Sequence, residues 1–471
     1  MSAANQEVPQ LKRTLGLWDL VLFNLTAIVG LRWVATAART GAYSLTLWVL
    51  ALLMFFIPQG LAVVALSTRY PEEGGIYDWT KRAFGNFHGF FCGWCYWVSN
   101  LSYFPSLLIS GVVAGVYLGG PEHLWLGQSS WFVCGLALLM LALVTALNVA
   151  GTEKGKWLQN IGGLATWIPG MLLVGLGALA WRRFGSATSF SGSALVPHLE
   201  MGTLSFWSTQ AFAYAGLELG PIMAGEIRDP RRTVPRAILI SGFFIALIYI
   251  AGTAALLVAV PSSEVNVITG PVQAIDATAR REGFPSLAGV VGLLIALACM
   301  GGAGAWLAGS ARLPFVAGID RFLPPAFGRV HPRWKTPHVA ILTQAGLAAV
   351  LLIIGLPGGT VAEAYLFLQE MTVLLYFVPF LYLFVALMAL STKPLPAGAI
   401  PVPGGRIGAY IVGGLGALTT AIALVLALVP ATEVSKPWVY EVKLVGGTLG
   451  FFLIGVVLYR KGKSQKSKGK S

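Results

Sequence analysis

Residues 212–236 read FAYAGLELGPIMAGEIRDPRRTVPR, an apolar segment with a glycine and a carboxylate near its middle and an arginine cluster at its end. In a continuous membrane helix, Gly216 would weaken the helix and Glu218 would need a partner or a proton. A helix that breaks at Ala215 and Gly216 would instead free backbone N–H and C=O groups to bind a small polar solute, with Glu218 beside them. The segment therefore predicts a broken membrane helix that forms half of a ligand site.

The composition indicates a polytopic membrane protein. Of the 471 residues, 56% are hydrophobic and only 11% are charged, whereas about 25% are charged in soluble domains. Apolar runs of about 20 residues, the length that crosses a bilayer, recur along the chain. They predict an all-α protein with twelve spans at residues 18–38, 45–67, 87–118, 131–149, 158–181, 203–227, 237–260, 287–316, 339–356, 362–390, 407–429 and 442–459.

The positions of Lys and Arg predict the topology. If the tail at residues 1–14 is cytoplasmic, most of the 32 basic residues fall in segments on that same side of the membrane. Because basic residues near span ends are retained in the cytoplasm, we expect a multi-pass protein of the cell membrane with both termini inside. The net charge of +13 then reflects topology, and we expect no nucleic-acid partner. The basic tail at 460–471 is expected to be cytoplasmic and solvated, with contact to anionic lipid as the alternative.

Neither the cysteines nor the histidines indicate a cofactor. The four cysteines all fall in apolar runs, and the five histidines show no metal-ligand spacing. Cys92 and Cys95 form a C-x-x-C motif, but it opens a membrane span and lacks the βαβ context of a redox site. We interpret the pair as small packing residues and expect no metal and no cofactor. The polar first residues also give no sign of a cleavable signal peptide.

The first span, WDLVLFNLTAIVGLRWVATAART at residues 18–40, contains a deeply placed charge. Arg32 lies too far along the span for its side chain to reach the cytoplasmic interface easily. One interpretation is that Arg32 extends to the opposite interface together with Arg39. The other is that the span breaks near residues 27–30 and that Arg32 faces an aqueous cavity.

Three motifs in order along the chain give a resemblance to a known family. Residues 69–85 read RYPEEGGIYDWTKRAFG, and the segment at 212–236 contains F-x-Y-x-G-x-E followed by D-P-R-R-T-x-P. Residues 312–337 read RLPFVAGIDRFLPPAFGRVHPRWKTP. Together these motifs resemble the amino acid–polyamine–organocation transporter family, over about residues 15–390.

The resemblance implies a leucine-transporter-type fold of two inverted five-helix repeats, at residues 15–182 and 203–390. Spans one and six would be broken at the substrate, and two further helices would follow at 407–459. In this family an amino acid binds at the breaks, its carboxylate on N–H groups of span one and its ammonium on carbonyls of span six. The preference of helix N-termini for anions supplies the physical reason.

Span one departs from the family pattern. The family usually has a G-S-G turn there, whereas this chain has Ala27, Ile28, Val29 and Gly30. Two β-branched residues approach a ligand less closely than glycine does, so the usual carboxylate capture is in doubt. Arg32 could compensate by donating two hydrogen bonds to an anionic group.

The two predicted breaks, the polar residues of span three and two aromatic positions give the candidate substrate-binding residues. Phe212 and Trp306 match positions where the family places aromatic rings, which can close on a ligand or hold an ammonium. Asn100 and Tyr103 have the alternative role of bonding neighbouring helices. The full set is Thr26, Ala27, Ile28, Val29, Gly30, Asn100, Tyr103, Phe212, Tyr214, Ala215, Gly216 and Trp306.

Four charged residues are candidates for gating or proton coupling. Glu218 resembles the family's gating carboxylate and is a candidate proton carrier, with a structural hydrogen-bonded carboxyl as the alternative. Arg32 and Glu370 are hypothesised to pair as an outer gate, because spans one and ten approach each other in this fold. Glu226 is expected in an ion-pair network at the inner face, close to the arginines that follow it.

The sequence thus predicts a secondary transporter that moves an amino acid by alternating access, with proton coupling and exchange both open. Since Arg32 opposes a cationic substrate, neutral or acidic amino acids are favoured. The alternatives are transport of another small amine or organic solute, or a membrane-embedded transferase. A transferase would need paired aspartates, a His-rich motif or a nucleophile with its base, and no such motif appears, so we expect no enzyme. The expected partners are a small-molecule substrate and the lipid bilayer, with a homodimer or an accessory subunit left open.

Overall fold

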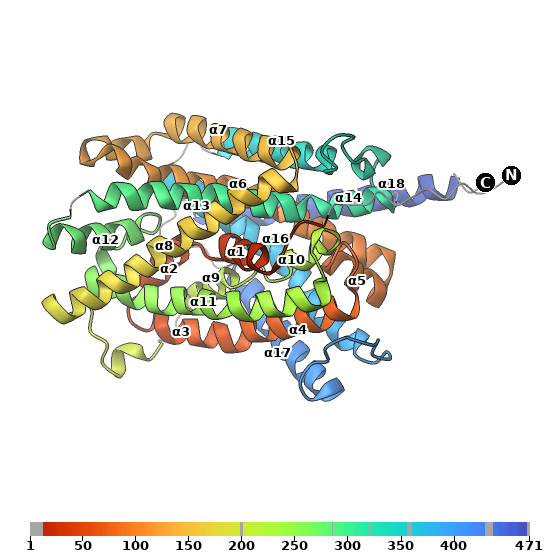
Figure 1. The fold of residues 1–471 in the computed structure, drawn as a ribbon, viewed down its shortest axis with the longest axis horizontal. Coiled ribbons are helices and arrows are strands. Elements are labelled where there is room, and N and C mark those ends of the chain that lie inside the picture. Colours follow the sequence, from red (N-terminus) through yellow and green to blue (C-terminus); the bar gives the residue numbers. More distant parts are fainter. Residues whose placement is uncertain are drawn as a thin grey trace.

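The computed structural model describes residues 13–197, 201–284, 286–320, 322–355, 360–428 and 437–468. Residues 1–12 of the first predicted tail and 469–471 of the second lie outside the described residues, whereas residues 460–468 of the second tail continue the last helix. Over the described ranges the chain forms helices and loops, and one isolated β-bridge joins Leu15 to Ile227. The long helices run roughly along one common axis, as Figure 1 shows. The prediction of an all-α membrane fold is confirmed.

Eleven of the predicted spans correspond to helical segments that are long and apolar enough to cross a membrane, counted over the described ranges. Three of these segments are built from two helices in succession. The helices are α1 (Leu17–Ile28) with α2 (Leu31–Ala38), α3 (Ser44–Ala51) with α4 (Ile57–Arg69), α6 (Asn86–Gly115), α7 (Ser130–Val149), α8 (Thr152–Phe184), α11 (Pro230–Ala259), α13 (Leu287–Ser310) with α14 (Arg312–Ile319), α15 (His338–Gly355), α16 (Val361–Leu390), α17 (Gly405–Leu426) and α18 (Pro437–Lys468).

The remaining predicted span, the sixth along the chain at residues 203–227, is interrupted. No single helix of spanning length therefore represents it. Its halves are α9 (Met201–Ala213) and α10 (Leu219–Ile222). Gly216 between them has φ +132°, and a Cβ at this position would lie 2.8 Å from Cγ1 of Ile28. Only glycine tolerates both the backbone angle and the close neighbour. The break predicted at Ala215 and Gly216 is therefore present.

The break in span one has a different backbone. Helix α1 ends at Ile28 and α2 begins at Leu31, and Val29 and Gly30 between them are extended. Val29 still donates its N–H to the carbonyl oxygen of Leu25 at 2.9 Å, but the N–H of Gly30 turns to the Tyr249 hydroxyl instead. The i to i−4 hydrogen bonds stop there, so backbone groups at the end of α1 and the start of α2 are released from helical pairing. The interruption falls within the predicted residues 27–30.

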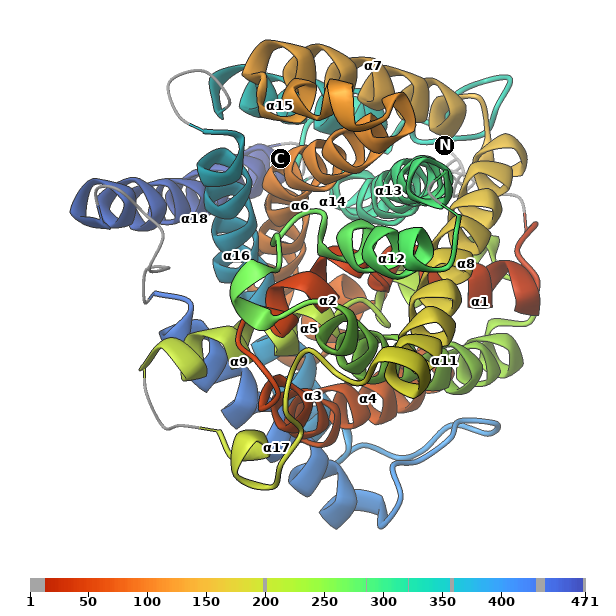
Figure 2. The same ribbon diagram turned by 90° about the vertical axis from the view of Figure 1, so that its left-hand side faces the viewer.

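The two breaks lie at the centre of the bundle and share one contact. In the view along the bundle, α2 lies near the middle, with α6, α13, α8, α11 and α16 around it (Figure 2). The Tyr249 hydroxyl of α11 lies 2.6 Å from the carbonyl oxygen of Ile28 and 3.0 Å from that of Ala213. It also accepts the N–H of Gly30 at 3.3 Å. Tyr249 thereby holds both breaks against the same helix.

Candidate substrate site and its charged neighbours

A small cavity lies where the two breaks face α6, α13 and α16. Its volume is about 10 Å³, which is about the smallest space that can hold one water molecule. We call it the aromatic cavity; its lining residues are Ala27, Ile28, Trp33, Ser99, Asn100, Tyr103, Phe212, Ala213, Ala215, Trp306, Thr372 and Tyr376. In this conformation the cavity therefore has room for about one water molecule.

The lining contains seven of the substrate-binding residues that the sequence predicts. They are Ala27, Ile28, Asn100, Tyr103, Phe212, Ala215 and Trp306. The sequence analysis missed Trp33, Ser99, Ala213, Thr372 and Tyr376. Ser99 lies next to Asn100, and Trp33 lies next to Arg32, so both missed residues are sequence neighbours of predicted ones. Thr372 and Tyr376 come from α16, on which no motif marked a site.

Aromatic rings form most of the wall. Trp306 donates its indole N–H to the carbonyl oxygen of Ala27 at 2.7 Å, which joins α13 to the first break. Its ring meets Tyr103 and Tyr376 at centroid distances of 5.2 Å and 5.6 Å, both edge to face. Phe212 contacts Tyr376 in the same geometry at 5.6 Å. Such walls bind apolar side chains and can hold an ammonium against a ring face.

Asn100 adds an amide group to this wall. Its amide nitrogen donates to the carbonyl oxygen of Tyr96 at 2.8 Å, whereas its amide oxygen is buried without a hydrogen-bond partner. An unpaired buried acceptor is costly, so it favours a ligand or a water that can donate to it. Asn100 can therefore accept a hydrogen bond from a bound solute.

Glu218 is completely buried next to the aromatic cavity and receives three hydrogen bonds. Its Oε1 accepts the hydroxyl of Tyr96 at 2.8 Å and also that of Tyr376, and its Oε2 accepts the amide of Gln59 at 2.9 Å. All three donors are neutral groups, so the carboxyl has no counter-ion among them. Because Tyr376 also lines the aromatic cavity, one side chain separates Glu218 from the solute space.

A second cavity of about 20 Å³ adjoins the first and shares Ala27 and Tyr103 with it. We call it the arginine cavity because Arg32 lines it. It also contains the predicted residues Thr26, Val29 and Gly30. The complete lining is Thr26, Ala27, Val29, Gly30, Leu31, Arg32, Tyr103, Leu107, Ser110, Thr166, Ile295, Ala298 and Cys299.

The Arg32 side chain is only 4% exposed. Its guanidinium carbon lies 4.5 Å from the ring centre of Trp33 and 5.4 Å from that of Tyr103. The Nε and Nη2 atoms have no hydrogen-bond partner. Among the described residues, two of the three guanidinium nitrogens thus lack an acceptor, while aromatic faces stabilise the charge.

The hypothesised pair of Arg32 and Glu370 is not formed in this conformation. Across the described segments, no ion pair links the two side chains. Instead, Glu370 accepts a hydrogen bond from the hydroxyl of Tyr440, on α18, at 2.6 Å. The structure therefore directs Glu370 toward α18, and it lines neither cavity.

Three further candidates have structural contacts. The Thr26 hydroxyl lies 2.7 Å from the carbonyl oxygen of Leu22 and 2.8 Å from that of Gln159, so it ties α1 to α8. Tyr214 packs on Trp48 and Phe56, outside both cavity linings. Gly216 also lines neither cavity, but its contact with Ile28 brings the two breaks together.

Glu226 belongs to a second group of buried charges, located beyond α10. Its partner is Arg312 of α14, whose Nη2 lies 2.5 Å from the Glu226 Oε1 and whose Nε lies 2.9 Å from it. The sequence predicted instead that Glu226 pairs with the arginines that directly follow it in the chain. Glu73, which is half-buried, accepts the backbone N–H of Gly225 at 2.6 Å. Burial, together with the negative charge of Glu226, raises the pKa of Glu73 to about 8.

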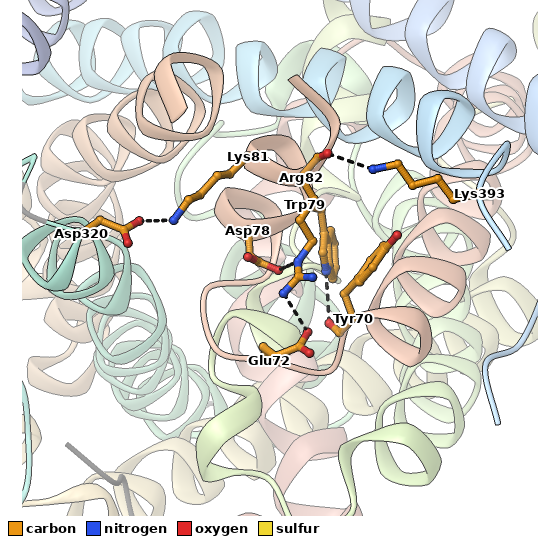
Figure 3. A network of polar contacts seen from close by, with 8 residues as sticks. All are labelled: Tyr70, Glu72, Asp78, Trp79, Lys81, Arg82, Asp320 and Lys393. Atoms are coloured by element: carbon orange, nitrogen blue, oxygen red, sulfur yellow. Dashed lines mark hydrogen bonds and ion pairs between the residues drawn. The ribbon is translucent and has the colours of Figure 1, made fainter. Parts of the chain in front are cut away.

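Helix α5 (Ile76–Phe84) is held at the same end of the bundle by polar contacts, drawn in Figure 3. Lys81 forms an ion pair of 2.6 Å with Asp320, which follows α14. Arg82 pairs with Asp78, and its carbonyl oxygen accepts from Lys393 at 3.2 Å. These contacts tie α5 to the ends of α14 and α16. Helix α5, within the motif at residues 69–85, is thus a junction between two spans.

The broken helices and the two cavities can now be set beside the families that the chain matches. The family model described as amino acid permease matches residues 15–449, which is nearly the whole chain. The chain belongs to the amino acid permease family. The resemblance drawn from the three sequence motifs is therefore confirmed.

Relatives of this permease extend over its full length. It is 27% identical to an uncharacterized transporter of Legionella pneumophila, over 96% of this chain and 98% of the relative. It is 23% identical to a probable agmatine/putrescine antiporter of Lactococcus lactis, with 98% of each chain covered. The crystal structure of MhsT in complex with L-phenylalanine is similar with a TM-score of 0.63, at 14% identity, over 88% of this chain and 99% of that one. This last likeness concerns the fold alone.

Proposed function

We propose that this permease, a membrane transporter of the amino acid and amine class, moves an amino acid across the cell membrane as a secondary transporter, by alternating access. The observation that carries this proposal is the aromatic cavity at the junction of two helix breaks. Released backbone groups, aromatic rings and the unpaired Asn100 oxygen together suit a small zwitterion.

The contracted cavity supports a cycle that passes through a closed state. In that state Trp306 is bonded to Ala27 at the first break, and Phe212, which precedes the second break, packs edge to face on Trp33 at 5.4 Å, so side chains fill the solute space. We propose that the inverted repeats, residues 15–182 and 203–390, rock against each other and open this space to one side at a time. Both termini would be cytoplasmic, which places Glu226, Arg312 and helix α5 at the inner gate.

Glu218 is proposed as the proton carrier of the cycle. Tyr376 donates to its carboxylate and also lines the aromatic cavity. A substrate that displaces Tyr376 removes one of three stabilising donors from the carboxylate, which then binds a proton more readily. Protonation of Glu218 and occupation of the cavity are thereby linked through one side chain.

Proteoliposomes with an internal pH-sensitive dye test this proposal. We expect one or more of the twenty amino acids to drive proton movement through the wild-type protein. The Glu218→Gln variant is expected to lose substrate-driven proton movement while retaining exchange of labelled substrate. Glu370→Gln is the matched control, because Glu370 is a membrane glutamate that lines neither cavity. Proton movement that persists in Glu218→Gln would exclude Glu218 as carrier, and the absence of transport for every amino acid would overturn the proposed function.

A small amine is the second candidate substrate. The relative named as an agmatine/putrescine antiporter is similar over the full chain. A diamine would need acidic groups around both of its ammonium groups. Glu218 lies behind Tyr376 at the aromatic cavity, but the adjoining arginine cavity presents the positive charge of Arg32, which disfavours a second ammonium there. Adding putrescine and agmatine to the same transport panel separates the two candidates.

A further inference from the structure

Arg32 presents an unusual combination of burial and missing partners. A buried guanidinium normally has carboxylates or carbonyls for its N–H groups, because removing them from water is costly. Here Nε and Nη2 are buried without any acceptor. The aromatic faces of Trp33 and Tyr103 stabilise the charge, but a ring face offers no oxygen acceptor to these N–H groups.

In the part of the chain that the structure describes, no acid forms an ion pair with Arg32. The arginine cavity is lined by apolar residues, hydroxyls and the thiol of Cys299. Thr166, one of these hydroxyls, already donates to the carbonyl oxygen of Gly162 at 2.8 Å. Glu370 is engaged with Tyr440. The unmet hydrogen bonds of Arg32 therefore favour an acceptor that comes from outside the chain.

The position of Arg32 in its helix adds to this preference. Arg32 is the second residue of α2, which begins directly after the break at Val29 and Gly30. The N-terminal end of a helix carries a partial positive charge and favours anions. The guanidinium and the N-terminal end of α2 thus both favour an anion in the arginine cavity.

The arginine cavity also adjoins the aromatic cavity. Both are lined by Ala27 and Tyr103, so these two residues form the partition between them. A rotation of the Tyr103 ring would join the two spaces into one elongated site. One end of such a site would present a guanidinium, and the other end would present aromatic rings and the breaks.

We propose that the arginine cavity is an anion subsite that receives the second carboxylate of a dicarboxylic amino acid, while the rest of the substrate occupies the aromatic cavity. This inference rests on the proposed function and narrows its substrate class to acidic amino acids. Arg32 is then a specificity-determining residue, and a cationic substrate is disfavoured by its charge.

The test compares substrates that differ in a single charge. The melting temperature of the purified full-length protein is measured with glutamate, glutamine, aspartate, asparagine, putrescine or sodium chloride, each at the same millimolar concentration. Glutamate or aspartate is expected to stabilise the wild-type protein well above its amide counterpart, because a ligand that binds the folded state raises its stability. In titrations, Arg32→Met is expected to weaken that binding at least about tenfold, since hydrogen bonds to a charged group are lost. Arg32→Lys is expected to retain part of it, because the charge stays but the two-pronged geometry does not.

Arg39→Met is the matched control, since Arg39 is an exposed arginine at the end of the same helix and lines neither cavity. It is expected to bind glutamate like the wild type. Equal stabilisation by glutamate and glutamine, or unchanged glutamate binding in Arg32→Met, overturns the proposal. Equal stabilisation by chloride reduces the subsite to an inorganic anion site and overturns it as well. Binding and transport of neutral amino acids alone would overturn this inference but leave the proposed function intact.

Discussion

Two buried arginines in this permease have opposite surroundings. Arg312 is 2% exposed, and it bonds the Glu226 carboxylate through two nitrogens and the carbonyl oxygen of Ala308 through a third. Arg32 is 4% exposed, and two of its nitrogens are buried without a partner. The first arginine is therefore part of what holds the fold together. The fold leaves hydrogen bonds of Arg32 unmade, which is expected of a side chain that binds a ligand.

The largest expected effect tests this contrast directly through stability. Replacing Arg312 by methionine leaves Glu226 as a buried charge without its counter-ion, and it should lower the free energy of unfolding by about 3–5 kcal/mol. Replacing Arg32 by methionine removes a charge that lacks hydrogen-bond acceptors, so stability should be unchanged or raised. Both are measured by reversible denaturation in mixed micelles.

Arg39→Met serves as the reference for loss of an exposed arginine. The contrast between the two buried sites would be refuted if Arg32→Met destabilised the protein as strongly as Arg312→Met does. In that case Arg32 would be a structural residue, and its aromatic contacts would be its main role.

A moderate effect is expected from Glu73, next to the paired arginine. Its pKa of about 8 lies above the ordinary value of 4.5, because it is half-buried and faces the carboxylate of Glu226, against a smaller opposing effect of Arg312. The folded state therefore binds this proton more tightly than the unfolded state does. The stabilisation is fully present below about pH 4.5 and is lost as the pH rises through about 8.

The melting temperature measured from pH 5 to pH 9 checks this expectation. The wild-type curve should fall over this range, and the Glu73→Gln curve should fall less, since its amide does not ionise. Glu72→Gln is a suitable control, because Glu72 is the preceding residue and is exposed. If Glu73→Gln and Glu72→Gln gave the same pH dependence, Glu73 would not be the group responsible.

The smallest effect is expected from the cycle that combines Arg32→Met with Glu370→Gln. Since no ion pair joins these two side chains in the described structure, their effects on stability should add within about 0.5 kcal/mol. The same cycle at Arg312 and Glu226 should give a large coupling and serves as the positive reference. Strong coupling between Arg32 and Glu370, or transport restored by the double variant, would support the outer-gate pair in another state of the cycle.

The breaks were predictable because local chemistry requires them. Gly216, followed by Glu218, disfavours a continuous helix, and the structure uses the positive φ that only this glycine supplies easily. Arg32 was equally visible, because a charge in an apolar run is rare. Such signals lie within a few residues of the feature that they specify.

The missed residues lacked a local signal. Helix α16 is apolar on all sides, since it faces both lipid and other helices, so its pattern does not show that Tyr376 faces the cavity. Tyr249 on α11 is hidden in the same way. Arg312 lies 86 positions from Glu226, and nearer arginines offered equally plausible partners in the sequence. Tertiary packing decides which helix faces meet, and local patterns in a single sequence do not reveal that packing.

Tyr249 makes the two half-sites compete for a single hydrogen atom. A phenol carries one O–H, yet the carbonyl oxygens of Ile28 and Ala213 both lie within hydrogen-bonding distance of it. At any moment only one of these carbonyls can accept that hydrogen, and the other is left to seek a donor. Both residues line the aromatic cavity, so under the proposed function the ammonium of an amino acid would supply the missing donor. The Tyr249 hydroxyl would then take the place of one hydrogen bond that the substrate makes to the two breaks.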